Sequence, residues 1–136
     1  MKTEQSPFSQ FIHTVEMLRT HCPWDKKQTL SSSQKYLTEE YLEVLEAMQG
    51  NDSDALREEL GDLIFIVVLI SQICSDSGQF TIEDVIETIN MKMIRRHPHV
   101  FETKTEMSEE ELRKQWKRIK NEEKNSKKID TAPGKR

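Results

Sequence analysis

The sequence predicts an all-α protein, a helical bundle of about five helices that assembles as an oligomer. Apolar residues recur every three to four positions over long stretches, as they do on helices that face a core. Only four glycines and four prolines occur in 136 residues, and every proline falls at or outside an expected helix end. A chain of this length forms one core, so we expect one domain over residues 1–125 and a flexible basic tail over 126–136.

The first expected helix starts at Ser6-Pro7, because proline suits the first helical turn, and runs to about Thr20. The segment around Pro23 then leaves the helix, since the residue before a proline prefers an extended conformation. We expect a loop here that contains Trp24. That indole either packs under the loop or lies beside a ligand pocket, and its role stays open.

The next two expected helices are joined by a short turn. The first is capped within residues 31–33 and runs to about Met48, and the turn covers 49–53. The second ends near Ser75 and contains the run LIFIVVLI, which we interpret as helix because it continues without a break from Arg57. A helix that is apolar on all sides fits a bundle centre or an oligomer interface. The expected buried stripes are Leu37, Tyr41, Val44, Leu45 and Met48, then Leu60, Leu63, Ile64, Val67, Ser71 and Cys74.

Two capping boxes mark the last two helices. Thr81 with Asp84 opens one helix, which ends before Pro98, and Ser108 with Glu111 opens the other. The helix opened by Thr81 carries an apolar stripe of Ile82, Val85, Ile86, Ile89 and Met93. The helix opened by Ser108 carries Leu112, Trp116 and Ile119. The chain beyond about residue 125 has no apolar period, which predicts a frayed terminus.

Acidic pairs are concentrated on the two helices that flank the turn at 49–53. Glu40 and Glu43 are three residues apart, as are Glu59 and Asp62, so each pair shares one helix face at the rim of an apolar stripe. Nine acidic residues face one arginine between Glu39 and Asp62. Such a concentration of charge destabilises a bundle unless counter-ions are present.

Magnesium suits a site of this kind because it is a hard cation that binds carboxylates, waters and substrate phosphates. We therefore expect Glu40, Glu43, Glu59 and Asp62 to bind Mg²⁺, with Mn²⁺ as an alternative ion. Lys92 and Arg96 lie beside an apolar stripe and either extend past it to water or hold the phosphates of a substrate. The acidic groove favours the second interpretation. His97 and His99 do not make a metal site on spacing alone, and their role stays open.

Five segments of the chain, in this order and spacing, resemble the MazG-type nucleoside triphosphate pyrophosphohydrolases: CPWDKKQT, EEYLEV, EELGD, KMIRRHPHVF and a late WKRIK. The resemblance covers about residues 8–124. It implies an all-α, magnesium-dependent hydrolase that cleaves between the α and β phosphorus atoms and releases a nucleoside monophosphate and pyrophosphate. It also implies that Trp116 stacks on the base and Lys120 touches phosphate, often from a neighbouring subunit.

The attacking water needs a carboxylate to orient or deprotonate it. Glu39 and Glu58 adjoin the two pairs in sequence, and we assign them as candidates for this catalytic role or for a second ion. Nucleotide-pool house-cleaning is the expected role, with the preferred base undetermined. A relative that acts on dUTP or on a phosphoribosyl nucleotide fits the carboxylates equally well.

The composition indicates where the protein is located and which partners it binds. The net charge of −4 argues against a general nucleic-acid-binding surface, although the segment from Arg113 onward carries ten basic residues against three acidic ones. Two distant cysteines form no zinc motif or disulfide framework, and no run reaches the roughly 18 apolar residues of a membrane span. We expect a cytoplasmic homodimer or homotetramer.

Two other classes of function stay open. A non-catalytic helical dimer, in which the acidic groove only binds cations or a basic partner, would release no pyrophosphate at any magnesium concentration. A nucleic-acid-binding regulator that uses the basic last helix would bind in a salt-sensitive way that survives the loss of Glu40. Neither class accounts for the paired carboxylates.

Overall fold

The computed structural model describes residues 4–130, and side chains up to residue 127. All regular structure in this range is helical, which confirms the predicted all-α class. Two short helices add to the five long ones that were expected. The elements are α1 (Pro7–His21), α2 (Pro23–Lys27), α3 (Leu30–Gln49), α4 (Ser53–Asp76), α5 (Ile82–Arg96), α6 (Pro98–Phe101) and α7 (Glu109–Asp130).

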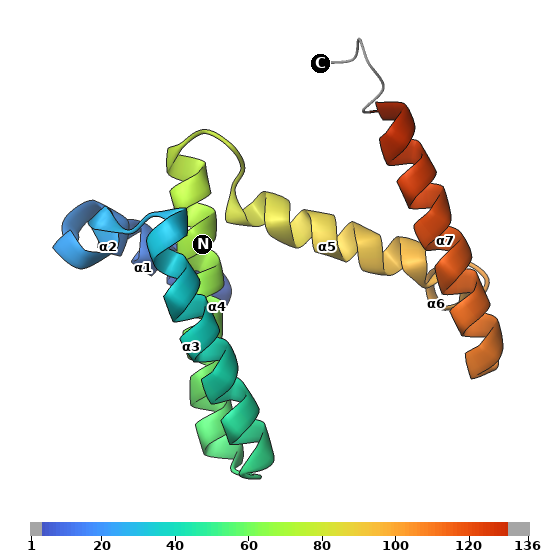
Figure 1. Cartoon of the computed structure of the whole chain (residues 1–136), viewed down its shortest axis with the longest axis horizontal. Helices are drawn as coiled ribbons and strands as arrows, with labels where there is room; N and C mark the ends of the chain where they lie inside the picture. The colour runs from blue at the N-terminus through green and yellow to red at the C-terminus, as the bar shows by residue number, and fades with distance from the viewer. Residues whose placement is uncertain (1–3, 131–136) are drawn as a thin grey trace. The chain divides into compact units, whose positions relative to one another are not determined.

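The chain forms two compact units that meet in sequence between Val85 and Ile86. The boundary between them falls inside the stretch, residues 1–125, that was expected to be one domain. The first unit contains α1 to α4 and the first turn of α5. Its longest elements are α3 and α4, which lie side by side and antiparallel around the turn at 50–52 (Figure 1).

A small apolar core joins α1, α4 and the start of α5. Val15, Val68 and Ile82 are buried there, and Phe11, Ile12, Phe65 and Val85 pack against them. Burial of each such aliphatic side chain contributes about 1.5–3 kcal/mol. The rings of Phe11 and Phe65 meet edge to face with centroids 6.4 Å apart. This core fixes α4 against α1, and α4 carries Glu59 and Asp62, two of the four expected metal ligands.

The helix starts follow the sequence at most positions. Ser6 caps α1 with Pro7 at its first turn, and both predicted capping boxes form, Thr81 with Asp84 and Ser108 with Glu111. The start of α3 differs from the prediction, because Thr29 rather than residues 31–33 caps the helix. Ser32 instead supplies the reciprocal side chain of that box, as its hydroxyl accepts from the Thr29 N–H.

The predicted stripe on α4 is partly wrong. Ser71 and Cys74 are buried as expected, but Leu60, Ile64 and Val67 remain 40–46% exposed. Ile66, Leu69 and Ile73 are buried in their place. On α3, Val44 is buried while Leu37, Tyr41 and Met48 are exposed, and Ile86 and Ile89 of α5 are exposed too. Because α4 is apolar on every side, its periodicity does not determine which face packs within one chain.

The segment after α1 is more ordered than the predicted loop, because Pro23 starts the short helix α2. Arg19 holds this segment: its guanidinium donates to the carbonyls of Asp25, Lys26 and Gln28 and pairs with Asp76 at the end of α4. Trp24 meets the Tyr36 ring edge to face with centroids 5.3 Å apart. The indole therefore contacts α3 and remains 37% exposed.

The second unit contains the rest of α5, then α6 and α7. Pro98 ends α5 as predicted and also begins α6. Arg95 and Arg96 of α5 both pair with Glu123 of α7, and Ile119 and Gln115 of α7 are buried. The helix α7 extends to Asp130 and so includes the first five residues of the expected flexible tail, and residues 131–136 lie outside the described range.

Candidate active site

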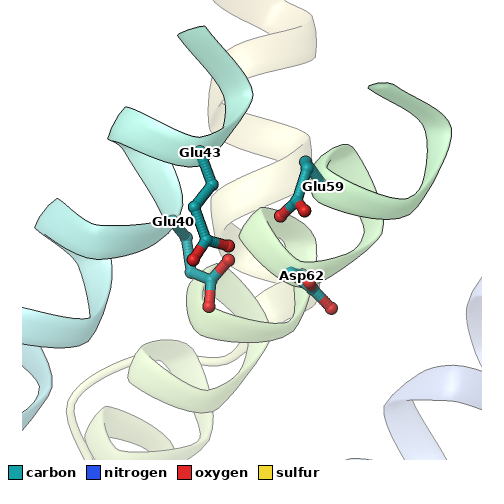
Figure 2. Close-up of side chains that lie close together, drawn as sticks. All are labelled: Glu40, Glu43, Glu59 and Asp62. Atoms are coloured by element: carbon teal, nitrogen blue, oxygen red, sulfur yellow. The ribbon is translucent and has the colours of Figure 1, made fainter. Parts of the chain in front are cut away.

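Four carboxylates meet between α3 and α4. Glu40 and Glu43 extend from α3, and Glu59 and Asp62 extend from the first half of α4 (Figure 2). One carboxylate oxygen from each of the four residues lies within 4.8 Å of the others. The antiparallel hairpin brings the two helical pairs together, and the i, i+3 spacing places both members of each pair on the shared face.

The cluster contains buried oxygens without partners. Glu40 and Glu59 are half-buried, and the Oε2 atom of each has no hydrogen-bond partner in the described part of the chain. An unpaired buried carboxylate oxygen is costly, so such atoms are uncommon unless a ligand completes them. Glu43 and Asp62 are more exposed and leave the site open to solvent on their side.

The charge of the cluster shifts the acidity of its half-buried members. Burial raises the pKa of Glu40, and the negative charges of Glu43 and Asp62 raise it further. The pKa of Glu59 is raised to about 7. The largest cause is a hydrogen bond with Glu43, and burial and the nearby negative charges add to it. Like charges at this distance favour the protonated form unless a cation neutralises them.

The donor set fits a hard divalent cation. All four ligands are carboxylate oxygens, which Mg²⁺ prefers, and opposite ligands of a magnesium octahedron lie roughly 4.2 Å apart. The 4.8 Å span of the four oxygens is only slightly larger. The two oxygens without partners belong to Glu40 on α3 and Glu59 on α4, so both helices contribute an unsatisfied acceptor to the cluster.

The two carboxylates assigned to water activation lie outside this cluster. Glu39 and Glu58 are both exposed, and neither contributes an oxygen to the group of four. Glu39 acts on the site through its charge, which adds a small further increase to the pKa of Glu40. A cavity of about 480 Å³ opens beside the cluster, lined by Glu43, Glu59 and the turn at 50–52 among others.

The four residues assigned to substrate belong to the second unit. Lys92 and Arg96 line one groove of about 930 Å³, in which basic side chains outnumber acidic ones; the other charged lining residues are Arg95, Arg118 and Lys127 against Glu102, Glu122 and Glu123. Arg96 is held by Glu123 through two contacts, Nε to Oε1 at 3.2 Å and Nη2 to Oε2 at 3.1 Å. The two predicted phosphate ligands therefore share one basic surface.

Trp116 and Lys120 contact each other, as their spacing of one turn predicted. The Lys120 ammonium lies 4.4 Å from the centroid of the Trp116 ring, a cation–π arrangement. Trp116 is half-exposed and lines a cavity of about 330 Å³. Arg96 lines the same cavity, so the second unit brings together two of the predicted substrate residues on one wall.

Sequence reasoning missed Glu123, which binds both Arg95 and Arg96. These guanidinium contacts hold its pKa at about 2 despite its burial. The sequence carried only a weak signal, since Glu123 lies 27 residues after Arg96 in a run of mixed charge. Pairings across such a separation depend on how α5 and α7 pack.

The helical fold and the oxygen-only cluster define the class: an α-helical protein in which four carboxylates converge from two antiparallel helices in an arrangement that could hold a cation. A family model narrows this class. The model of the MazG nucleotide pyrophosphohydrolase domain matches residues 28–101, which include all four clustered carboxylates, and the chain belongs to that family.

A relative with a stated activity agrees with this assignment. The chain is 45% identical to the nucleoside triphosphate pyrophosphohydrolase/pyrophosphatase MazG of Thermotoga maritima over 94% of its own length and 49% of the relative. It is also 45% identical to the uncharacterized protein YabN of Bacillus subtilis, over 93% of its length and 27% of that protein. The chain thus spans about a quarter to a half of the length of these relatives.

A solved structure has a similar fold. The crystal structure of a mazG-related protein from Thermotoga maritima superposes with a TM-score of 0.74 at 30% identity, covering 83% of this chain and 98% of that one. Within residues 4–130, no helix is long and apolar enough to cross a membrane.

Proposed function

We propose that this protein hydrolyses nucleoside triphosphates, ribo- or deoxyribo-, to the nucleoside monophosphate and pyrophosphate, as part of nucleotide-pool house-cleaning. The observation that carries the proposal is the cluster of four carboxylate oxygens within 4.8 Å, two of whose members have buried oxygens without partners. Family membership supports the same reaction, as does the printed activity of the Thermotoga maritima relative.

Glu40, Glu43, Glu59 and Asp62 would hold Mg²⁺, or Mn²⁺ in its place. A bound ion of this kind neutralises phosphate charge and lowers the barrier to attack by water. The half-buried Glu40 and Glu59 would hold the cation from the buried side, while the exposed Glu43 and Asp62 would leave room for phosphate oxygens and water. We assign Glu39 or Glu58 to orienting that water, because both are exposed and next to cluster residues in sequence.

Cations of the chain complete the phosphate contacts in this proposal. Arg96 keeps donors on Nη1 after its two bonds to Glu123, and guanidinium groups suit phosphate oxygens. Lys92 lines the same groove and supplies a point charge. Trp116 would stack on the base and Lys120 would contact phosphate.

We also propose that the protein is a homo-oligomer, a dimer or a tetramer. Leu60, Ile64 and Val67 form an exposed apolar face on α4, and a second copy of the chain would cover it. A cytoplasmic location accords with two free cysteines, one of them buried.

The reaction is tested with a panel of ribo- and deoxyribonucleoside triphosphates, including oxidised and deaminated bases, scored for pyrophosphate against orthophosphate. We expect pyrophosphate to be the first product and to require a divalent cation. Orthophosphate as the primary product would refute α–β cleavage.

Glu40→Gln provides the test of the site. The variant loses a ligand, so we expect loss of cation-dependent turnover, while the melting temperature of the metal-free protein stays equal or rises because repulsion in the cluster falls. Glu16→Gln, an exposed glutamate of α1 outside the cluster, is the control. Full turnover of Glu40→Gln at the wild-type magnesium optimum would remove Glu40 from the site.

A further inference from the structure

The second unit contains a cavity whose histidines have no role in the proposed phosphate contacts. It has a volume of about 330 Å³ and is lined by residues of α5, α6 and α7, among them Met93, Leu112 and the indole of Trp116. Small-molecule sites are mostly apolar concavities of roughly this size or larger, with a few polar groups that set orientation. The polar groups of the lining are the imidazoles of His97 and His99, the buried amide of Gln115, and the guanidinium groups of Arg96 and Arg113.

The two imidazoles are held in opposite hydrogen-bonding states. His97 Nδ1 contacts the carbonyl of Met93, which only accepts, so this nitrogen carries the proton and Nε2 is an acceptor in the neutral ring. His99 Nδ1 lies 3.1 Å from Nε2 of Gln115, which donates, so the proton of the neutral ring is on Nε2. The pair thus offers one acceptor and one donor.

This arrangement is built into the fold. The Gln115 side chain is 8% exposed, so its amide is fixed by packing and orients the His99 ring from behind. The rings of His97 and His99 lie close together, with centroids 5.6 Å apart. Neither Nε2 atom has a hydrogen-bond partner among the described residues.

The cavity adjoins the basic groove. Arg96 lines both, and Lys92, Arg95 and Arg118 line only the groove. A ligand with an apolar planar end and an anionic end would place the first in the cavity and the second in the groove. A nucleotide has this form, because its base stacks on aromatic rings and its phosphates pair with guanidinium groups.

We propose that His97 and His99, which line the cavity beside the Trp116 indole, select the base that stacks on this indole by its hydrogen-bonding edge, with Gln115 as the residue that positions His99. The proposal rests on the proposed nucleotide hydrolase function. Enzymes that bind a single base read it by such edge contacts combined with stacking.

The donor and acceptor distinguish two classes of base. Guanine and uracil carry a lactam edge, in which a ring N–H adjoins a carbonyl. Adenine and cytosine carry an amidine edge, in which a ring nitrogen acceptor adjoins an amino group, so donor and acceptor stand in the opposite order. With the sugar and phosphates fixed by the groove, only one order matches the His97 and His99 pair.

Binding is tested with the full chain carrying Trp24→Phe, in which Trp116 is the single indole. Guanosine, uridine, adenosine and cytidine 5′-monophosphates are titrated while Trp116 fluorescence is followed. We expect saturable quenching with one edge class preferred over the other by about five- to tenfold, the effect of one or two hydrogen bonds. Equal binding of all four, or silent fluorescence with a nucleotide that the protein turns over, would overturn the proposal.

Selection is tested by substitution. His99→Phe and Gln115→Leu should reduce the preference between edge classes to about unity, whereas His99→Gln, which keeps a donor, should retain most of it. His13→Phe, an exposed histidine of α1, is the matched control. An unchanged preference in folded His99→Phe would refute the role of the pair. Quenching without pyrophosphate release from any triphosphate would instead refute the proposed reaction and leave the cavity as a base site.

Discussion

Glu123 is the main charged contact between α5 and α7, and its removal by Glu123→Gln tests how the second unit is held. The carboxylate accepts from Arg96 at 3.2 and 3.1 Å and from Arg95 at 3.2 Å. The side chains of Arg96 and Glu123 are only 12% and 18% exposed. The guanidinium contacts lower the pKa of Glu123 to about 2.

The pKa sets the size of the effect. A carboxyl that titrates at about 2 instead of 4.5 gains roughly 3 kcal/mol of stabilisation at neutral pH. The Arg95 side chain is half-exposed, and solvent weakens that contact. We therefore expect Glu123→Gln to reduce the free energy of unfolding by about 2 kcal/mol at pH 7.

The pH dependence gives the sharper test. Because the folded-state pKa is depressed, the stabilisation is complete above the unfolded pKa of 4.5 and is lost as the pH falls toward 2. Denaturant titrations that follow Trp116 in the Trp24→Phe background should show the variant and its parent converging between pH 4.5 and 2. The neighbouring Glu122→Gln is the control and should match the parent throughout. A gap that is equally large at pH 3 and pH 7, or no gap at pH 7, would refute this reasoning.

Three further predictions address the first unit, the assembly and the last helix. The folded-state pKa of Glu59 is raised to about 7, so the stability of the metal-free protein should decline as the pH rises from 4.5 to 7. Thermal melts of Glu59→Gln should lack this decline. The same dependence of melting temperature on pH in both proteins would contradict the prediction. Light scattering should find at least a dimer, and Ile64→Glu on the exposed face of α4 should dissociate it; a wild-type monomer of 16.0 kDa would disprove the oligomer. Trp116→Ala should raise the Michaelis constant about tenfold or more at all salt concentrations. Lys120→Ala should raise it chiefly at low salt. Normal Michaelis constants in both variants would mean that α7 has a structural role and does not contact the nucleotide.

Local signals in the sequence predicted most of the fold. Ser6-Pro7 and the two capping boxes act within three or four residues, so the helix starts that they mark were correct. The spacing of Glu40 with Glu43 and of Glu59 with Asp62 is also local. The turn at 50–52 is so short that the two helices must pack antiparallel. The geometry of the cluster was therefore within reach of sequence alone.

What the sequence could not predict depends on packing between distant segments. The run at 63–70 is apolar on all sides, so its pattern could not distinguish Leu69, which is buried, from Ile64, which is exposed. The pairing of Glu123 with Arg96 and of Gln115 with His99 joins residues 16 to 27 positions apart. Short helices such as α2 form because tertiary contacts, here those of Arg19, stabilise one and a half turns that are too short to persist alone.

The hairpin of α3 and α4 also determines when the carboxylates meet during folding. Glu40 and Asp62 belong to consecutive helices joined by a turn of three residues, and contacts this close in sequence form earlier than those that close long loops. The mutual repulsion of the cluster then acts on the nascent hairpin, before α1 and α5 have covered α4. A divalent cation would lower that repulsion at the start of folding, so its concentration would govern the rate at which the chain reaches the native state as well as the stability of that state.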